Sequence, residues 1–172
     1  MKPLDDLNSR FDYQSETETN GGKRSRIERW RILKGDGYLR GDCEDYSLTL
    51  IWLMEDRSMW KFWLAIWTFK YRLWHCVSPG GVGHAILYHD GKWIDNIQRK
   101  WMDASPKSLG YKMRFPMIAP YVAIKMLISW VMKKRTPMDD HDKMMYAASG
   151  VSLLGVVTII AVVWYFIYGS ST

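Results

Sequence analysis

Residues 41–56 read GDCEDYSLTLIWLMED and predict the helix around which the rest of the fold is built. Asp42 stands where a helix N-cap is expected, and apolar residues then repeat three and four positions apart, which is typical of a helix with one face in a core. We therefore expect a helix from about Asp42 to Asp56, with Cys43 at its start.

A β-hairpin is expected downstream of this helix. Residues 83–88 and 92–96 are strand-like, and His89-Asp90-Gly91 joins them. Asp-Gly supplies the positive φ angles that a tight hairpin turn requires. A helix followed by consecutive strands is the pattern of an α+β domain, with the helix packed on an antiparallel sheet.

The segment between the helix and the hairpin allows two interpretations. Residues 60–67 and 71–77 are rich in aromatic and branched side chains, as strands are, whereas the unbroken run 59–74 also suits a helix. Pro79-Gly80-Gly81 ends this segment.

The N-terminal part is expected to hold little regular structure. Residues 1–25 are polar with few large apolar side chains, which predicts a flexible arm. A helix is expected to open near Ser25, with Ile27, Trp30 and Leu33 on one face, and to end at the turn formed by residues 35–37. The arm lacks the apolar core of a secretory signal peptide, so export by that route is not expected.

Composition narrows the functional classes. The chain has 172 residues, two cysteines and a net charge of +6. One domain fits this length. Two cysteines without a Cys-x-x-Cys pair argue against a disulfide scaffold or a structural zinc module. The basic residues are scattered, so no nucleic-acid partner is expected.

The C-terminal region predicts a membrane anchor. Residues 147–168 contain no charged residue, and their length matches the ~20 residues that cross a hydrocarbon core as a helix. Lys133, Lys134 and Arg135 precede the run, which predicts that the body of the protein faces the cytoplasm. Residues 117–146 are expected to form an amphipathic helix, over 117–132, and a charged linker. That helix would lie on the lipid bilayer or pack on the domain. If it crossed the membrane instead, it would form a hairpin of two membrane-spanning helices with the anchor.

Cys43 is the candidate nucleophile. A helix N-terminus offers unpaired backbone N–H groups and the positive end of the helix dipole, so we expect the pKa of this thiol to be lowered. The same N–H groups could stabilise a developing oxyanion during acyl transfer.

His84 and Asp95 supply the two other groups that such a nucleophile needs. A base must lie within hydrogen-bond reach of the thiol, and a third group must orient the base. If the hairpin pairs as expected, His84 and Asp95 approach one another across the ladder. Neighbouring residues on a strand point to opposite faces, so His75 and Cys76 do not suggest a zinc site.

These motifs resemble those of the bacterial transglutaminase-like cysteine peptidases, within the transglutaminase-like and papain-like superfamily. Residues 41–46 resemble the nucleophile motif, residues 83–85 the histidine motif and residues 93–96 the acid motif. The resemblance covers about residues 26–96, and we take residues 26–116 as the peptidase domain. It implies a catalytic triad of Cys43, His84 and Asp95.

The resemblance also raises calcium as a cofactor, since some members depend on it. By resemblance, Asp42 and Glu44 would be the ligands, with Asp45 as an addition. The same residues are explained without metal if Asp42 caps the helix while Glu44 and Asp45 favour its dipole. Both interpretations stay open at this stage.

The expected function is therefore a membrane-anchored cysteine peptidase or amidase that acts on a protein or peptide through a thioester. Transfer to an amine instead of water fits the same residues. The alternative is a non-catalytic, membrane-associated viral structural or lysis-related protein that retains the fold. Short chains of this kind look like phage-encoded members of the family.

Overall fold

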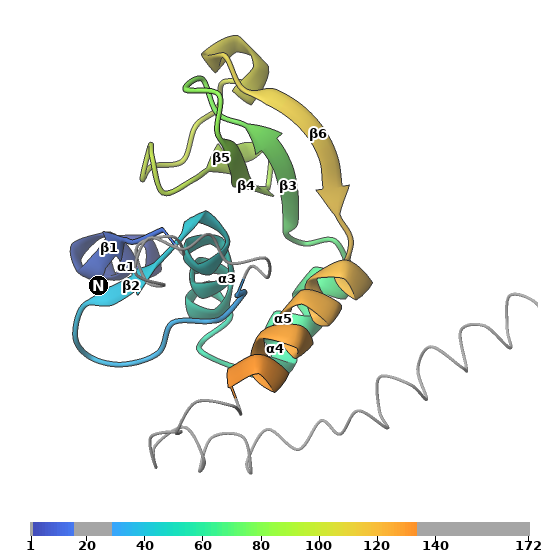
Figure 1. The fold of residues 1–172 in the computed structure, drawn as a ribbon. Helices are drawn as coiled ribbons and strands as arrows, with labels where there is room; N and C mark the ends of the chain where they lie inside the picture. The colour runs from blue at the N-terminus through green and yellow to red at the C-terminus, as the bar shows by residue number, and fades with distance from the viewer. Residues whose placement is uncertain (1, 16–28, 134–172) are drawn as a thin grey trace, which may run out of the picture. The chain divides into compact units, whose positions relative to one another are not determined.

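The computed structural model describes residues 2–15 and 29–133, whose arrangement is shown in Figure 1. It confirms the α+β class, because helices accompany a four-stranded antiparallel sheet. In chain order the elements are α1 (Pro3–Arg10), β1 (Phe11–Tyr13), β2 (Leu39–Gly41), α3 (Cys43–Met54), α4 (Met59–Trp67), β3 (Arg72–Val77), β4 (Gly83–His89), β5 (Lys92–Ile94), η1 (Pro106–Leu109), β6 (Lys112–Met117) and α5 (Ala119–Lys133).

Helix α3 is the central helix of the domain, as predicted. The Asp42 side chain caps it by accepting a hydrogen bond from the Asp45 backbone N–H at 3.1 Å. Tyr46, Leu50 and Ile51 are fully buried. Most residues of α3 are buried, so the helix packs against the domain on more than the one apolar face that the sequence pattern predicted.

The predicted hairpin is confirmed as β4 and β5. Leu87 pairs with Ile94, and the strands are joined by Asp90 and Gly91, whose φ angles are 47° and 79°. Two consecutive positive φ angles are those of a type I′ turn, which matches the twist of paired strands. The sheet order is β5-β4-β3-β6 (Figure 1).

The sheet is packed on both faces. On one face, Leu73, Ala85 and Leu87 join the core that α3 occupies. On the other, a smaller cluster forms around Ile86 and Tyr111, with Cys76 and Met102. Neighbouring residues of β4 thus alternate between the two clusters, as the two-residue period of a strand requires.

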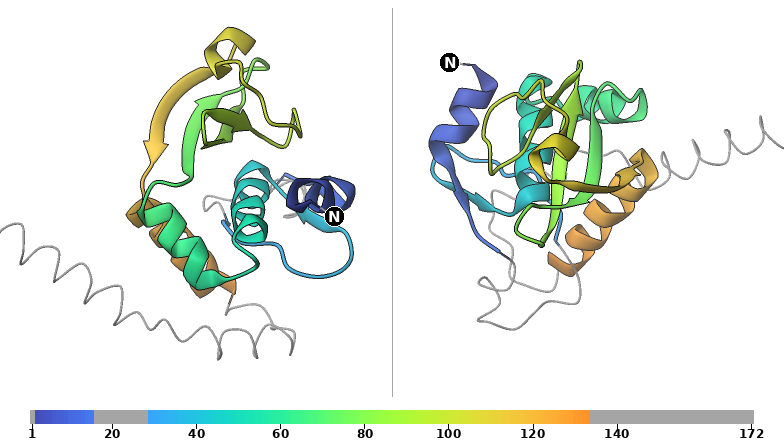
Figure 2. Two further views of the ribbon diagram at one scale, coloured as in Figure 1. Left: turned by 180° about the vertical axis from the view of Figure 1, so that it is seen from behind. Right: turned by 90° about the horizontal axis from the view of Figure 1, so that it is seen from above.

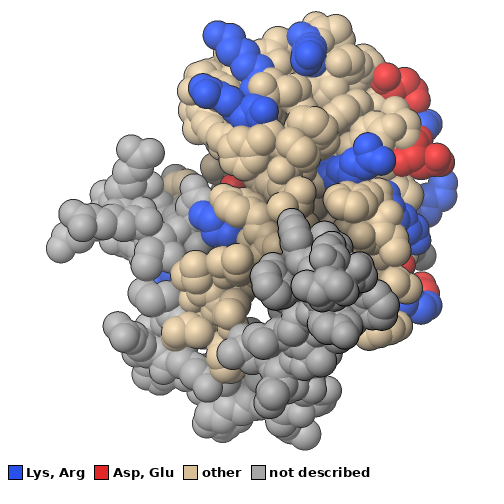
Figure 3. All heavy atoms as spheres, turned by 90° about the vertical axis from the view of Figure 1, so that its right-hand side faces the viewer, with Lys and Arg blue, Asp and Glu red and all other residues tan. Residues whose placement is uncertain are grey.

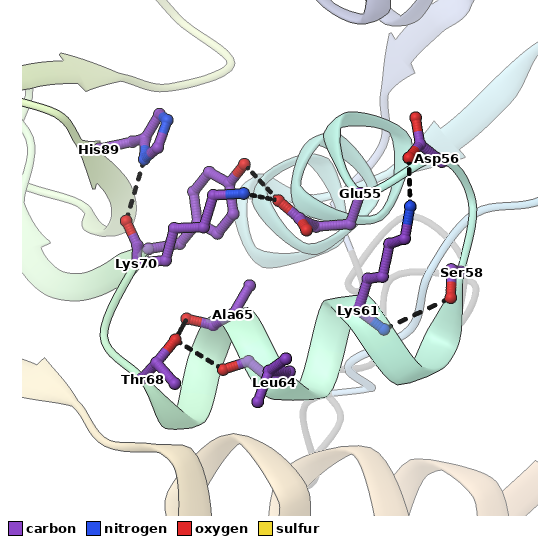
Figure 4. Close-up of polar contacts among 10 residues, drawn as sticks. Glu55, Asp56, Ser58, Lys61, Leu64, Ala65, Thr68, Lys70 and His89 are labelled. Atoms are coloured by element: carbon purple, nitrogen blue, oxygen red, sulfur yellow. Dashed lines mark hydrogen bonds and ion pairs between the residues drawn. The ribbon is translucent and has the colours of Figure 1, made fainter.

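The ambiguous aromatic segment is a helix in its first half and a strand in its second. The strand interpretation of residues 60–67 is wrong, because α4 occupies them, whereas β3 confirms the strand expected at 71–77. Ser58 caps α4 by accepting from the Lys61 backbone N–H at 3.4 Å, and Thr68 Oγ1 donates to the Leu64 carbonyl near its end (Figure 4). The buried side chains of α4 (Phe62, Ala65 and Ile66) repeat at helical spacing.

A buried carboxylate joins the end of α3 to the start of the sheet. Glu55 Oε1 accepts a hydrogen bond from Tyr71 Oη at 2.8 Å and pairs with the Lys70 ammonium, while His89 Nδ1 lies 2.9 Å from the Lys70 carbonyl (Figure 4). Because Glu55 is only 8% exposed, these partners provide the interactions that water would otherwise supply.

The predicted flexible arm over residues 1–25 is wrong for its first part. Residues 3–13 form α1 and β1, and β1 pairs in parallel with β2. Leu7 and Phe11 are buried in the main core. Proline in the first turn, Asp5 and Asp6 near the start and Arg10 near the end are helix signals that outweigh the polar composition. Residues 16–25 lie outside the described part of the chain.

The helix expected from Ser25 to residue 34 is also wrong where the structure describes it. Residues 29–34 have no regular secondary structure, and residues 25–28 are not described. Side chains satisfy the backbone instead: the N–H groups of Trp30, Arg31 and Leu33 donate to Ser129 Oγ, Asp45 Oδ1 and Thr49 Oγ1. An irregular segment can stay buried when its backbone donors find such acceptors.

Strand β6 and helix α5 complete the domain. The sequence did not predict β6, an edge strand that pairs with β3 and tolerates Pro116. Helix α5 confirms a helix in the region expected at 117–132. Within residues 2–15 and 29–133, no helix combines the length and apolarity needed to cross a membrane. The linker residues 134–146 and the predicted anchor at 147–168 fall outside these ranges.

Charged side chains are dispersed on the surface. On the face shown in Figure 3, the described Lys and Arg side chains form several separate groups, and some lie beside Asp or Glu. Surface pairs such as Lys92 with Asp103 and Arg40 with Asp12 belong to this pattern.

Candidate functional site

Cys43 is the first residue of α3, directly after the Asp42 cap. Its side chain donates a hydrogen bond from Sγ to Glu44 Oε2 at 2.9 Å, and the Ala85 backbone is close enough to the sulfur to influence the pKa of the thiol. Ala85 follows His84 on β4, so the start of α3 meets the sheet beside the predicted base. Cys43 is 7% exposed.

The expectation of a lowered Cys43 pKa is wrong. The pKa of this thiol is raised well above its ordinary value, first by burial and then by the adjacent Glu44 carboxylate and by Asp42. The N–H of Ala85 acts in the opposite direction but is outweighed. Helix-dipole stabilisation of a thiolate is weaker than the combined cost of desolvation and a neighbouring negative charge.

His84 and Asp95 form a direct pair, as the hairpin predicted. His84 Nε2 lies 2.9 Å from Asp95 Oδ2. His84 is on β4 and Asp95 directly follows β5, and both are buried. In this pair Nε2–H is the natural donor to the carboxylate, which leaves the lone pair on Nδ1 as the proton acceptor.

Asp95 accepts hydrogen bonds from three groups in addition to its contact with His84. Its Oδ1 accepts from the backbone N–H groups of Ile97 and Gln98 at 3.1 and 2.7 Å, and its Oδ2 also accepts from Tyr111 Oη at 2.7 Å. Burial alone would raise the pKa of Asp95, but the hydrogen bonds from His84, Gln98 and Tyr111 lower it below its ordinary value. Asp95 is therefore a fixed anion.

Tyr111 is the site residue that sequence reasoning missed. It is 3% exposed, directly precedes β6 and stacks obliquely on His84, with the ring centroids 6.0 Å apart. The alternation of large side chains after Gly110 would have indicated a strand there, but the pairing of β6 with β3 is not readable from sequence.

The structure brings Cys43 to the position next to His84 without joining the two by a hydrogen bond. Within the described residues, the thiol donates a hydrogen bond to Glu44, and the His84 ring is hydrogen-bonded to Asp95. Forming a thiol–imidazole pair requires the Cys43 side chain to leave Glu44.

The acids suggested for calcium do not gather around a common point. Asp42 caps α3, Glu44 accepts from the thiol, and Asp45 binds the backbone and guanidinium of Arg31 at 2.9 and 3.0 Å. Among the described residues, no three His, Cys, Asp or Glu side chains cluster closely enough to hold a metal ion. The capping interpretation accounts for Asp42.

Cys76 and His75 lie on β3, and their side chains contact neighbouring strands of the sheet. Cys76 is fully buried, bonds from Sγ to the His84 carbonyl at 3.4 Å, and has its pKa raised by burial to about 12. His75 stacks on Phe115. Both cysteines are free thiols.

No protein-family model matches the chain, and a search of curated proteins also finds no match. The class of protein is therefore defined by the structure alone. It is an α+β domain with a cysteine at the start of a central helix, adjacent to a buried histidine–aspartate pair on an antiparallel hairpin.

Proposed function

We propose that the protein is a cysteine peptidase or amidase with a transglutaminase-like, papain-like core, in which Cys43, His84 and Asp95 are the catalytic triad. One observation carries the proposal: His84 Nε2 is fixed 2.9 Å from the buried Asp95 carboxylate, on a strand that contacts α3, the helix that begins with Cys43. A base oriented by a buried anion next to a helix-start thiol is the arrangement that nucleophilic acyl transfer needs.

The first half of the reaction forms a thioester. The Cys43 thiol passes its proton to His84 Nδ1 as sulfur attacks the amide carbonyl carbon, so an S–C bond forms. Asp95 stabilises the resulting imidazolium. The C–N bond then breaks, and the imidazolium returns the proton to the leaving amine. The Cys43 backbone N–H, at the helix start, is suited to receive the oxyanion.

The second half releases the acyl group. Water loses a proton to His84 Nδ1 and attacks the thioester carbonyl, the C–S bond breaks, and the proton returns to the sulfur. An amine in place of water would give transamidation by the same steps, so the two outcomes differ only in which nucleophile reaches the thioester.

Because the pKa of Cys43 is raised, we infer that the thiol loses its proton to His84 only as the sulfur attacks the carbonyl carbon. A resting thiol that is mainly protonated needs a general base during the reaction, in contrast to a preformed thiolate. His84 is that base, and Glu44 is the acceptor that the thiol must give up.

The membrane part of the proposal rests on sequence. The uncharged run at residues 147–168 would anchor the protein, and the basic residues 133–135 would keep the catalytic domain on the cytoplasmic side.

Hydrolysis of p-nitrophenyl acetate by the full-length chain tests the proposal without knowledge of the natural substrate. We expect an acetyl thioester on Cys43, detected by peptide mass spectrometry, and turnover that Cys43→Ala abolishes. Cys76→Ala is the matched control, because it removes the other thiol and should leave turnover in place.

Two outcomes would oppose the proposal. Turnover that survives Cys43→Ala would exclude the nucleophile. A correctly folded wild-type chain that is not acylated at Cys43 would favour the non-catalytic alternative.

A further inference from the structure

Helix α5 exposes an apolar face to solvent. Val122 is fully buried, and the hydroxyl of Ser129 accepts from the Trp30 backbone N–H at 2.6 Å, so this side faces the domain. The other side carries four aliphatic residues that are 38–56% exposed, at spacings of three and four: Ile124, Leu127, Ile128 and Val131.

This exposed face departs from the pattern of a surface helix in a soluble domain. Such a helix places charged and polar residues toward water. In α5, Lys125 is the only charged residue from Ala119 to Met132. A helix that is apolar on both sides is expected where the second side also meets an apolar medium.

Helix α4 has the same character. Phe62, Ala65 and Ile66 are buried in the core, whereas Trp60 and Trp67 are 72% and 40% exposed. Leu64, between them on the same helix face, is 52% exposed. The views in Figures 1 and 2 agree that α4 and α5 lie at the same end of the domain, away from α1.

The sequence after α5 indicates what covers these faces. Lys133 ends α5, Lys134 and Arg135 follow at once, and the predicted anchor begins at Ala147. The 13 residues from 134 to 146 can extend at most about 45 Å, at ~3.5 Å per residue. If the run is inserted, α5 is therefore held close to the bilayer. Tryptophan side chains favour the membrane interface, and clustered basic residues favour anionic headgroups.

We propose that the exposed faces of α4 and α5 form a lipid-docking surface, which lays the catalytic domain on an anionic bilayer. The docking surface comprises Trp60, Leu64, Trp67, Ile124, Leu127, Ile128 and Val131. The proposal rests on the membrane anchor in the proposed function and is independent of the chemistry of Cys43.

Nitroxide accessibility in vesicles tests the docking surface. The full-length chain carrying Trp60→Cys or Ile128→Cys is spin-labelled and reconstituted in vesicles of phosphatidylcholine and phosphatidylglycerol at 3:1. Val82→Cys is the control, because Val82 is 66% exposed on the turn between β3 and β4, away from α4 and α5 (Figure 1). The unsubstituted chain, treated identically, gives the background from the buried Cys43 and Cys76.

We expect labels at positions 60 and 128 to collide more with oxygen than with a water-soluble nickel chelate, and the label at 82 to show the reverse. If all three labels favour the nickel chelate while the chain still floats with the vesicles, the docking surface is refuted and the anchor stands. Labels at 60 and 128 that are shielded from both reagents would mean that protein covers these faces, which also refutes it. A chain that does not float with vesicles would refute anchor and docking surface together, whatever its turnover of p-nitrophenyl acetate.

Discussion

Burial is the largest cause of the raised Cys43 pKa, and the Glu44 carboxylate is the strongest single neighbour that adds to it. At 2.9 Å from the sulfur, Oε2 stabilises the protonated thiol and disfavours a thiolate. The helix start positions Cys43 but does not lower the pKa of its thiol. The proposed reaction therefore requires both a base and the withdrawal of Glu44.

Replacing Glu44 with glutamine should activate the thiol. Glu44→Gln removes the negative charge beside Sγ, so the Cys43 pKa should fall toward its ordinary value. A fall of one unit raises the thiolate fraction about tenfold at neutral pH. Iodoacetamide alkylation, followed at each cysteine by mass spectrometry, measures the change, with Cys76 as the internal reference. An unchanged or slower rate at Cys43 would show that Glu44 does not control the thiol.

Tyr111 should prove to be a positioning residue for Asp95. Tyr111→Phe removes the hydrogen bond to Oδ2 and should cost about 1.5–3 kcal/mol of unfolding free energy, as hydrogen bonds to charged groups do. Asp95 has a lowered folded pKa, so its contribution to stability is complete above the ordinary carboxyl pKa and is lost as pH falls through the folded value.

In the Tyr111→Phe variant the folded pKa of Asp95 should lie closer to the ordinary value, so this loss should be smaller and should be complete at higher pH than in the wild type, within the range below about pH 4. Urea unfolding measured between pH 2 and 7 tests the shift. Tyr38→Phe is the matched control, because Tyr38 is 81% exposed. Identical acid profiles for the wild type and Tyr111→Phe would remove Tyr111 from the site.

Sequence analysis predicted the catalytic candidates better than their environment. The order of Cys43, His84 and Asp95 indicates a triad because each residue type is needed in that chemistry. Tyr111 could not be assigned, because its role depends on the fold bringing a residue 16 positions along the chain to Asp95. The Glu44 contact depends on a side-chain rotamer, which sequence does not specify.

Among the secondary-structure elements, those with strong local signals were predicted best. The Asp90-Gly91 turn specifies the hairpin because its positive φ angles suit these two residues. The aromatic run of α4 carries no such signal, since large aromatic side chains occupy strands and buried helices alike. Ser58 caps the helix, but a serine can be assigned as an N-cap only when the start of the helix is already known.

The junction of β2 and α3 depends on Gly41. A Cβ atom at this position would lie 2.6 Å from Asp45 Oδ2 and 2.7 Å from Asp45 Cβ. Asp45 cannot move aside easily because Arg31 holds its carboxylate. The absence of a side chain at residue 41 therefore allows the strand to enter the first turn of α3 closely.

Gly41→Ala should destabilise the fold by about 1–3 kcal/mol, as overpacking does. Gly37→Ala is the control, because a Cβ atom there would meet nothing within 4 Å, and its cost should stay within ~0.5 kcal/mol. Chemical unfolding of both variants makes the comparison. Equal stability of the two would contradict the close approach at Gly41.

For the whole molecule, the N-terminal segment is part of the domain. Asn8 links α1 to two other regions: its Nδ2 donates to the Arg99 carbonyl at 2.7 Å, and its Oδ1 accepts from Tyr46 Oη at 2.8 Å. Arg99 also donates its backbone N–H to the Asp95 carbonyl. Helix α1 thus supports the loop that follows Asp95. Composition alone could not predict this, because the segment is short and its buried residues are few.

Leu7→Ala tests whether α1 belongs to the cooperative unit. Leu7 is fully buried, so truncation should cost about 2–5 kcal/mol through lost apolar contact and a cavity. Leu109→Ala, at a site that is 38% exposed, should cost much less. Thermal and urea unfolding report both values. A negligible effect of Leu7→Ala would restore the flexible-arm interpretation.

The proposed triad requires that His84 acts on Cys43. The most direct measurement is the rate of Cys43 alkylation from pH 5 to 9, in the wild type and in His84→Ala, with Cys76 as the internal standard. We predict that Cys43 reacts faster than Cys76 in the wild type, and that His84→Ala slows Cys43 while leaving Cys76 unchanged. If His84→Ala leaves the Cys43 profile unaltered, the histidine is not its base and the peptidase assignment is contradicted.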